Sequence, residues 1–270
     1  MESNIGLNII ETEIIKVKGS DKQVVKEQVV IENALTVYLN DKEFVTMICS
    51  PVQEKELVTG MLCSEGIINK PEQLAKISLD KQEGLVWVET SESKTLGETM
   101  FLKRYLTSCC GKGRTSFYFA NDARLTQHIG SDLRITAQEV SFYINLLEKQ
   151  SELFRLTGGV HGGAVAAKGN LEFHTFDIGR LNVLDKIYGH TFTQRIDLSQ
   201  KVIVFSGRMS SEIVIKIGKM GCPILIGVSA PTALALKLAE ELGITVIGFA
   251  RKDRFNIYTH PERILFSVSE

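Results

Sequence analysis

Two adjacent cysteines, Cys109 and Cys110, stand in the segment TSCCGKGR, which runs from residue 107 to 114. Its glycines and cations suit neither a regular helix nor a strand, so we expect a mobile loop. A thiol becomes a good nucleophile or sulfur acceptor when its thiolate is favoured and solvent can reach it. Lys112 and Arg114 supply positive charge that favours the thiolate. Such a loop could take a sulfur atom from one partner, hold it as a persulfide and pass it on.

A metal site is the main rival explanation for this cysteine pair. Zinc prefers spaced pairs such as C-x-x-C, and no second pair of cysteines or histidines accompanies this one, so a structural zinc site is not expected. A chance cysteine pair in an exposed loop stays open as an alternative. The other three cysteines, Cys49, Cys63 and Cys222, stand among apolar residues, where cysteine usually acts as a small hydrophobe.

The composition excludes several classes of protein. With 270 residues, 44% of them hydrophobic, the chain can bury a sizeable core. Its 31 basic and 32 acidic residues leave a net charge of -1, so we expect no nucleic-acid or membrane partner. Five cysteines are an odd number, and the charged N-terminal stretch does not resemble a signal peptide. We therefore expect a cytoplasmic protein without a disulfide framework.

The first half of the chain is predicted to be rich in strands. Residues 9–19 and 23–49 alternate apolar and polar residues, and residues 77–90 predict two further strands around a turn. Between them, Ser50 can cap a helix whose first position is Pro51, with Gln53 completing a capping box and Gly66 at its exit. Residues 115–119, after the cysteine loop, are another strand candidate.

The second half predicts an α/β fold. A capping box of Thr136 and Glu139 opens a helix that ends at the glycines of residues 157–159, and a hairpin turning on residues 168–170 follows. From Lys201 onward, apolar strands alternate with helices as β-α-β-α-β, which is typical of a parallel sheet covered on both faces. We predict a β-rich domain over residues 1–130, carrying the cysteine loop, and an α/β domain over residues 131–270.

Polar residues follow each of the three predicted parallel strands, at residues 206–208, 229–232 and 249–254. Ligands of open α/β sheets usually bind at this edge. Helix N-termini carry free N–H groups there, so Ser210 or Thr232 beside Arg208 would suit a phosphate. Any one of these segments alone is better explained as an ordinary cap or turn, but together they favour an anionic ligand.

Two more segments are predicted to join this edge. TGGVHGG places His161 among four glycines, and the histidine is either a titratable site residue or a satisfied structural one. FDIGRLNVLDKIYG presents five polar residues around the start of a helix, namely Asp177, Arg180, Asn182, Asp185 and Lys186. A solvated amphipathic helix with local ion pairs is the alternative explanation of that segment.

These motifs, together with GMLCSEGII and the run from residue 206 to 264, resemble the formate dehydrogenase accessory sulfurtransferase family, FdhD. The resemblance extends from about residue 59 to 264. It implies a homodimer that receives sulfur from a cysteine desulfurase of the IscS type. The sulfur is then passed as a persulfide to the bis-guanine-dinucleotide molybdenum cofactor, a substrate rather than a permanently bound group, before that cofactor enters formate dehydrogenase.

The resemblance also assigns residues. The family loop typically reads C-G-x-C-G, so Cys109 is implied as the persulfide carrier, while Lys112 stands in place of the second cysteine and Cys110 is left as an accessory. The family's cofactor segment falls on residues 249–254. With the cations found above, the predicted cofactor-binding residues are Phe249, Ala250, Arg251, Lys252, Asp253, Arg254, His161, Arg180, Arg208, Ser229 and Thr232.

A cytidine-deaminase-like core in the second half is also implied. Deaminase chemistry is not expected, because His161 is followed by two glycines instead of the H-x-E of the zinc signature. A binding chaperone that only carries the cofactor to formate dehydrogenase is the main alternative function.

Overall fold

The computed structural model describes residues 8–91, 104–106, 126 and 128–266. Within them the largest sheet has six strands in the order β10-β9-β11-β12-β13-β14. The central strands β11, β12 and β13 are parallel. β9 pairs antiparallel with β11, β14 pairs antiparallel with β13, and β10 pairs antiparallel with β9 at the edge of the sheet. These strands are β9 (His161–Ala167), β10 (Asn170–Asp177), β11 (Val202–Phe205), β12 (Ile224–Gly227), β13 (Thr245–Arg251) and β14 (Arg254–Ile257). The predicted hairpin and the β-α-β-α-β unit are both confirmed.

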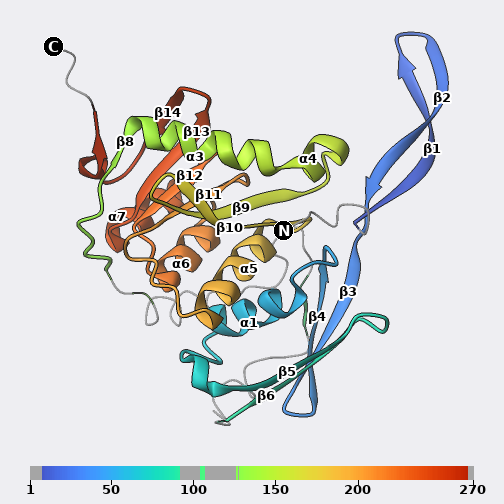
Figure 1. The fold of residues 1–270 in the computed structure, drawn as a ribbon, viewed down its shortest axis with the longest axis horizontal. Helices are drawn as coiled ribbons and strands as arrows, with labels where there is room; N and C mark the ends of the chain where they lie inside the picture. The colour runs from blue at the N-terminus through green and yellow to red at the C-terminus, as the bar shows by residue number, and fades with distance from the viewer. Residues whose placement is uncertain (1–7, 92–103, 107–125, 127, 267–270) are drawn as a thin grey trace.

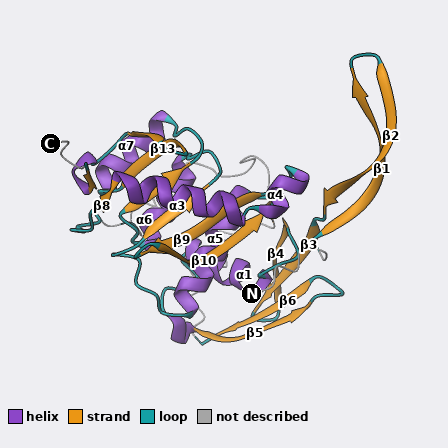
Figure 2. Ribbon diagram, turned by 45° about the horizontal axis from the view of Figure 1, so that its top comes forward, coloured by secondary structure: helices purple, strands orange, loops and turns teal. Residues whose placement is uncertain are grey.

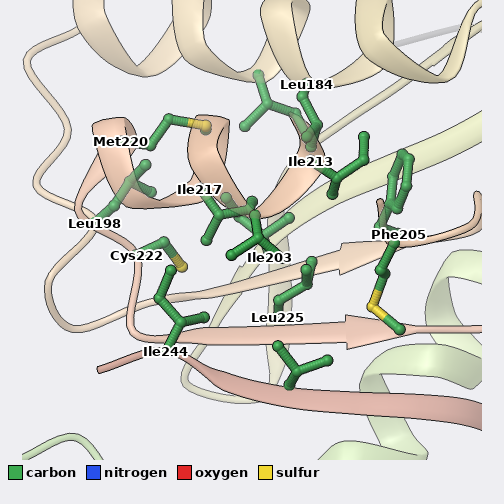
Figure 3. Close-up of a cluster of buried hydrophobic side chains, with 14 of the residues drawn as sticks. Leu184, Leu198, Ile203, Phe205, Ile213, Ile217, Met220, Cys222, Leu225 and Ile244 are labelled. Carbon is green, nitrogen blue, oxygen red and sulfur yellow. The ribbon is translucent and has the colours of Figure 1, made fainter. Parts of the chain in front are cut away.

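Helices cover both faces of this sheet (Figure 1). α3 (Ala137–Gln150) lies on one face, and α5 (Arg180–Thr193), α6 (Ser211–Met220) and α7 (Ala233–Leu242) lie on the other. Side chains of a strand alternate between faces. Ile203 and Phe205 therefore face α5 and α6 (Figure 3), whereas Val202 and Val204 face α3. Burial on both faces is the reason why β11 reads as an unbroken apolar run.

A second sheet has five strands in the order β5-β6-β3-β4-β7. They are β3 (Asn33–Leu39), β4 (Lys42–Cys49), β5 (Leu74–Asp80), β6 (Leu85–Thr90) and β7 (Arg104–Leu106). Helix α1 (Glu54–Ser64) packs on this sheet through Leu57, Val58 and Leu62 and meets α5 on its other side. α1 and α5 thus lie between the two sheets and connect them, as Figure 1 shows.

The contact between α1 and α5 depends on two glycines. A Cβ atom on Gly60 would lie 1.8 Å from the carbonyl oxygen of Asp185, and one on Gly189 would lie 1.9 Å from that of Glu56. Real side chains do not tolerate such distances, so the two backbones can approach this closely only where both residues are glycine. The crossing holds the two sheets at a fixed separation.

Helix starts show one confirmed and one wrong prediction. Thr136 and Glu139 form the expected capping box at α3. Ser50 does not cap α1, because its Oγ accepts from the Ile178 N–H of another element, and Gln53 takes the N-cap position in a left-handed conformation. The predicted helix after Thr136 is also interrupted at Ser151, so that α4 (Glu152–Thr157) forms a separate short helix ending at Gly158.

Two small sheets complete the described chain. β8 (Ile135–Thr136) pairs with β15 (Ile264–Leu265), and short 3-10 helices span Pro71–Gln73 and Pro261–Arg263. β1 (Ile9–Lys18) and β2 (Asp21–Val30) form a separate hairpin, which we name the arm. Figures 1 and 2 show that it projects away from both sheets. The strand candidate at residues 115–119 lies outside the described residues, and the domain boundary near residue 130 stays a prediction.

Candidate functional site

The predicted polar segments meet at one edge of the six-stranded sheet, where β11, β12 and β13 end. β9 runs the opposite way, so that its first residue, His161, lies at the same edge opposite Asp177, the last residue of β10. Arg251 at the end of β13 pairs with Arg254 at the start of β14. We name this place the carboxyl edge. Sheet topology thus brings together segments that the sequence separates by almost a hundred residues.

Hydrogen bonds fix the loops of the carboxyl edge to one another. The Gly162 N–H donates to Ser206 Oγ at 2.8 Å, and the Ser206 N–H donates back to the Gly162 carbonyl at 2.9 Å. Ser229 Oγ donates to the Ser206 carbonyl at 3.0 Å, and Thr232 Oγ1 caps α7 by accepting from the Ala235 N–H. Ser229 and Thr232 therefore hold backbone in place, whatever ligand their surroundings bind.

The turn between β13 and β14 presents most of the predicted cofactor residues to solvent. Arg251, Lys252, Asp253 and Arg254 are exposed, and Phe249 is 47% exposed although its ring is apolar. Phe249 and Lys252 both have positive φ angles, 52° and 53°, which the chain adopts at a cost in energy.

Ala250 differs from its neighbours in this turn. Its side chain is buried in the core on the α3 side, so it can offer a ligand only its backbone.

His161 lies among charged groups at the carboxyl edge. Burial and the positive charges of Arg180 and Arg208 lower the pKa of His161 below its ordinary value, and the negative charge of Asp177 only partly opposes them. The imidazole is therefore neutral near pH 7 and able to accept a hydrogen bond. The two guanidinium groups keep an excess of positive charge at this place, which suits an anionic ligand.

Four of the five polar residues around the start of α5 are buried and Arg180 is half-buried, which contradicts the alternative of a solvated helix. Asp177 and Lys186 form an ion pair of 2.7 Å with both side chains 0% exposed. Asp185 and Lys216 form a second one of 2.5 Å, and Asp185 also accepts from Ser64 Oγ at 2.7 Å. The second pair joins α5 to α6, and Ser64 links it to the end of α1. The sequence did not predict that these pairs are buried, because helical spacing does not show which other elements cover a helix.

The cysteines of the described chain are unsuited to sulfur chemistry. Burial, helped by the negative charge of Asp177, raises the pKa of Cys49 to about 12. Burial raises the pKa of Cys222 to about 12 as well, and it raises that of Cys63. All three are buried free thiols, as predicted. Cys109 and Cys110 lie outside the described residues. Within the described part of the chain, no cluster of His, Cys, Asp or Glu side chains could hold a metal ion.

The strand before the cysteine loop connects this loop to the carboxyl edge. β7 ends at Leu106, which pairs in parallel with Met47 of β4. β4 ends at Cys49, and the N–H of the next residue, Ser50, donates to Asp177 Oδ2 at 3.1 Å. The last described strand before residues 107–114 therefore runs toward the carboxyl edge.

The sequence model of the FdhD/NarQ family matches residues 30–265. The chain belongs to the FdhD/NarQ family. A relative from Bacillus subtilis, named sulfur carrier protein FdhD, is 43% identical over 240 residues, which is 89% of this chain and 91% of the relative. A relative of the same name from Staphylococcus haemolyticus is 45% identical over 237 residues, covering 87% and 89% of the two chains. The predicted family resemblance is confirmed.

The fold of this chain is similar to that of a solved protein from Desulfotalea psychrophila, whose crystal structure is described as that of a formate dehydrogenase accessory protein. The TM-score is 0.80 at 25% identity, and the match covers 96% of this chain and 100% of the other. The mixed α/β fold with several sheets agrees with the predicted fold class. No helix in the described part of the chain is long and apolar enough to cross a membrane.

Proposed function

We propose that this protein is a sulfur carrier for formate dehydrogenase, and that Cys109 holds the sulfur as a persulfide. The thiolate of Cys109 attacks the terminal sulfur of a persulfide on a cysteine desulfurase, so that one S–S bond forms as another breaks and the desulfurase thiolate leaves. The terminal sulfur then passes to the bis-guanine-dinucleotide molybdenum cofactor as its S–S bond to Cys109 breaks and the Cys109 thiolate leaves, and the two electrons that reduce this sulfur to sulfide would come from the reduced form of that substrate. Family membership and the names of the relatives support the sulfur-carrier role.

The observation that carries the proposal is the path of β7. This strand leads toward the carboxyl edge, and Cys109 follows its last residue, Leu106, by three positions. Three residues span at most about 11 Å. A tether of this length would allow the Cys109 thiol to approach the carboxyl edge, where an anionic acceptor would bind.

The charges at the carboxyl edge support a dinucleotide acceptor. Arg180, Arg208 and the turn of residues 249–254 would meet the pyrophosphate groups, and the exposed ring of Phe249 would stack on a guanine or pterin. His161, neutral near pH 7, would accept a hydrogen bond from the ligand. A cytoplasmic homodimer and a cytidine-deaminase-like core belong to the same proposal, as does Cys110 as an accessory thiol.

A binding chaperone for the cofactor is the second candidate. The cationic edge suits it as well as it suits a sulfur carrier, but a chaperone has no use for the thiols of the loop. Formate dehydrogenase maturation separates the two functions. A variant with alanine at both 109 and 110 should fail to support maturation if the protein carries sulfur, and should still support it if the protein is a chaperone.

Intact-protein mass spectrometry tests the carrier directly. After incubation with a cysteine desulfurase and cysteine, without reductant, the wild-type protein should gain one sulfur, roughly 32 Da. Cys109→Ala should abolish this gain, and Cys110→Ala should retain it. Cys222→Ala is the matched control, because that thiol is buried and its raised pKa keeps it protonated. A gain of one sulfur by Cys109→Ala would contradict the assignment of Cys109 as the persulfide carrier.

A further inference from the structure

The carboxylate of Asp177 has partners on both of its oxygens. Its Oδ1 accepts from the Gly179 N–H at 2.7 Å and from Asn182 Nδ2 at 2.8 Å. Its Oδ2 accepts from the Ser50 N–H at 3.1 Å and lies 2.7 Å from Lys186 Nζ. The side chain is completely buried, and a buried charge is tolerated only where such partners replace water.

These partners come from two parts of the chain. Gly179 and Asn182 belong to the start of α5, at the carboxyl edge, whereas Ser50 belongs to the connection between β4 and α1. Ser50 also accepts from the Ile178 N–H at 3.2 Å. The chain from residue 177 to 179 is therefore held by hydrogen bonds at its side chain and at two successive N–H groups.

Arg180 follows this anchored turn directly as the first residue of α5. The N-cap residue is Gly179, which has no side chain to fix the helix start. Asp177 holds this start in another way, because its Oδ1 accepts from the Gly179 N–H and from the side-chain amide of Asn182. The direction in which Arg180 leaves the turn thus depends on the carboxylate of a residue three positions earlier.

We propose that Asp177 is a positioning residue, which fixes the turn of residues 177–179 so that Arg180 is held ready for the anionic ligand. The inference rests on the proposed function, because it takes the carboxyl edge as the place where the guanine-dinucleotide substrate binds. Asp177 does not touch the ligand itself, since its carboxylate is buried and occupied on both oxygens.

The chain offers a matched control in its second buried ion pair. Asp185 and Lys216 are also buried, with each side chain 5% exposed. This pair joins α5 to α6, and Asp185 also contacts α1 through Ser64. Asp185 lies five positions beyond Arg180, more than one turn along α5 and outside the turn that Asp177 holds. Loss of this pair should change stability without changing the position of Arg180.

The test compares three double variants that leave no unpaired buried charge. D177L/K186M removes the acceptor for the Gly179 N–H and the Asn182 side chain, whereas D177N/K186M keeps an oxygen that can accept from both. D185L/K216M is the control. The probe is guanosine 5′-diphosphate, which has the guanine and pyrophosphate of one cofactor arm, measured by calorimetry. We expect affinity to fall at least about tenfold in D177L/K186M. The other two variants should stay within about threefold of wild type.

Equal affinity losses in D177L/K186M and D185L/K216M would overturn the proposal, since the effect would then follow stability. Wild-type affinity in a folded D177L/K186M would overturn it too. If that variant does not fold, D177A/K186M decides, because it removes the same acceptor with a smaller side chain and leaves no unpaired charge. A loss of at least about tenfold then supports the proposal, and wild-type affinity contradicts it.

Hydrogen exchange of the Gly179 amide separates this inference from the proposed function. If wild-type protein does not bind the probe, the proposed ligand is wrong, and the exchange rate then decides about Asp177 alone. Protection that is lost in D177L/K186M and kept in D177N/K186M supports the anchored turn. Protection that survives in both variants overturns it.

Discussion

At the scale of single residues, the charges around His161 determine how the carboxyl edge responds to pH. Burial, Arg180 and Arg208 all disfavour the imidazolium, so its pKa lies below the ordinary value of about 6.5. The folded protein then binds a proton less readily than the unfolded chain does. The contribution of His161 to folding stability is therefore complete above about pH 6.5 and is lost progressively as pH falls below it.

Removing Arg180 should raise the pKa of His161. In Arg180→Ala one of the two cations that oppose protonation is absent, while Asp177, which favours protonation, is retained. We expect the pKa to move upward toward its ordinary value, as measured by NMR titration of the imidazole. An unchanged titration curve would mean that burial and Arg208 lower the pKa of His161 without a contribution from Arg180. Lys252→Ala, at an exposed turn position, is the control and should leave the titration unchanged.

At the scale of elements, the crossing of α1 and α5 should be the most sensitive point of the fold. In Gly60→Ala a methyl group would meet the Asp185 carbonyl, and neither backbone can move without shifting a sheet. Overpacking a well-filled site typically costs 1–3 kcal/mol, and contact with backbone belongs at the upper end, so we expect a loss of about 3 kcal/mol or more in denaturant melts.

Gly130→Ala is the matched control for this prediction. A Cβ atom there meets nothing within 4 Å, and the residue does not have a positive φ. We expect its unfolding midpoint to stay close to that of the wild-type protein. If both substitutions had the same small effect, α1 and α5 would not be in close contact in solution.

At the scale of the whole molecule, the arm stands apart from the two sheets. The family match begins at residue 30, where the arm ends. The arm also exposes apolar side chains, among them Ile15 and Val24 at 65% each. A two-stranded ribbon contributes little to a core that it does not cover. The arm meets the body at the end of β2, where Val30 lies close to Gly159 beside α4, so that most of the arm is separable from the body of the fold.

We expect a chain that starts at Ile31 to keep its fold. Its melting temperature should stay within about 4 °C of that of the full chain, a shift that corresponds to roughly 1 kcal/mol for a protein of this size. The truncated chain should also gain sulfur at Cys109 as readily as the full chain. A melting temperature lowered by much more than this would show that the arm supports the body.

Local signals determined most elements from the sequence alone. The capping box at Thr136, the turn at Lys168 and Gly169, and the alternation of apolar strands and helices after Lys201 are each encoded within a few residues. They were predicted correctly because their hydrogen bonds and periodicities are short in sequence. The family motifs, which are also local, identified the family.

Tertiary structure alone decided which polar residues are buried and what they hold. Ser50 has the sequence context of a helix cap, yet it bonds Asp177 and Ile178, more than 120 positions away. The segment that contains Asp177 and Lys186 also fits a solvated helix by its sequence, yet both side chains are completely buried, and Asp177 accepts from the Ser50 N–H of the first half of the chain. A contact between distant segments cannot be predicted from the periodicity of either segment, because it depends on how the two sheets pack and not on local backbone preference.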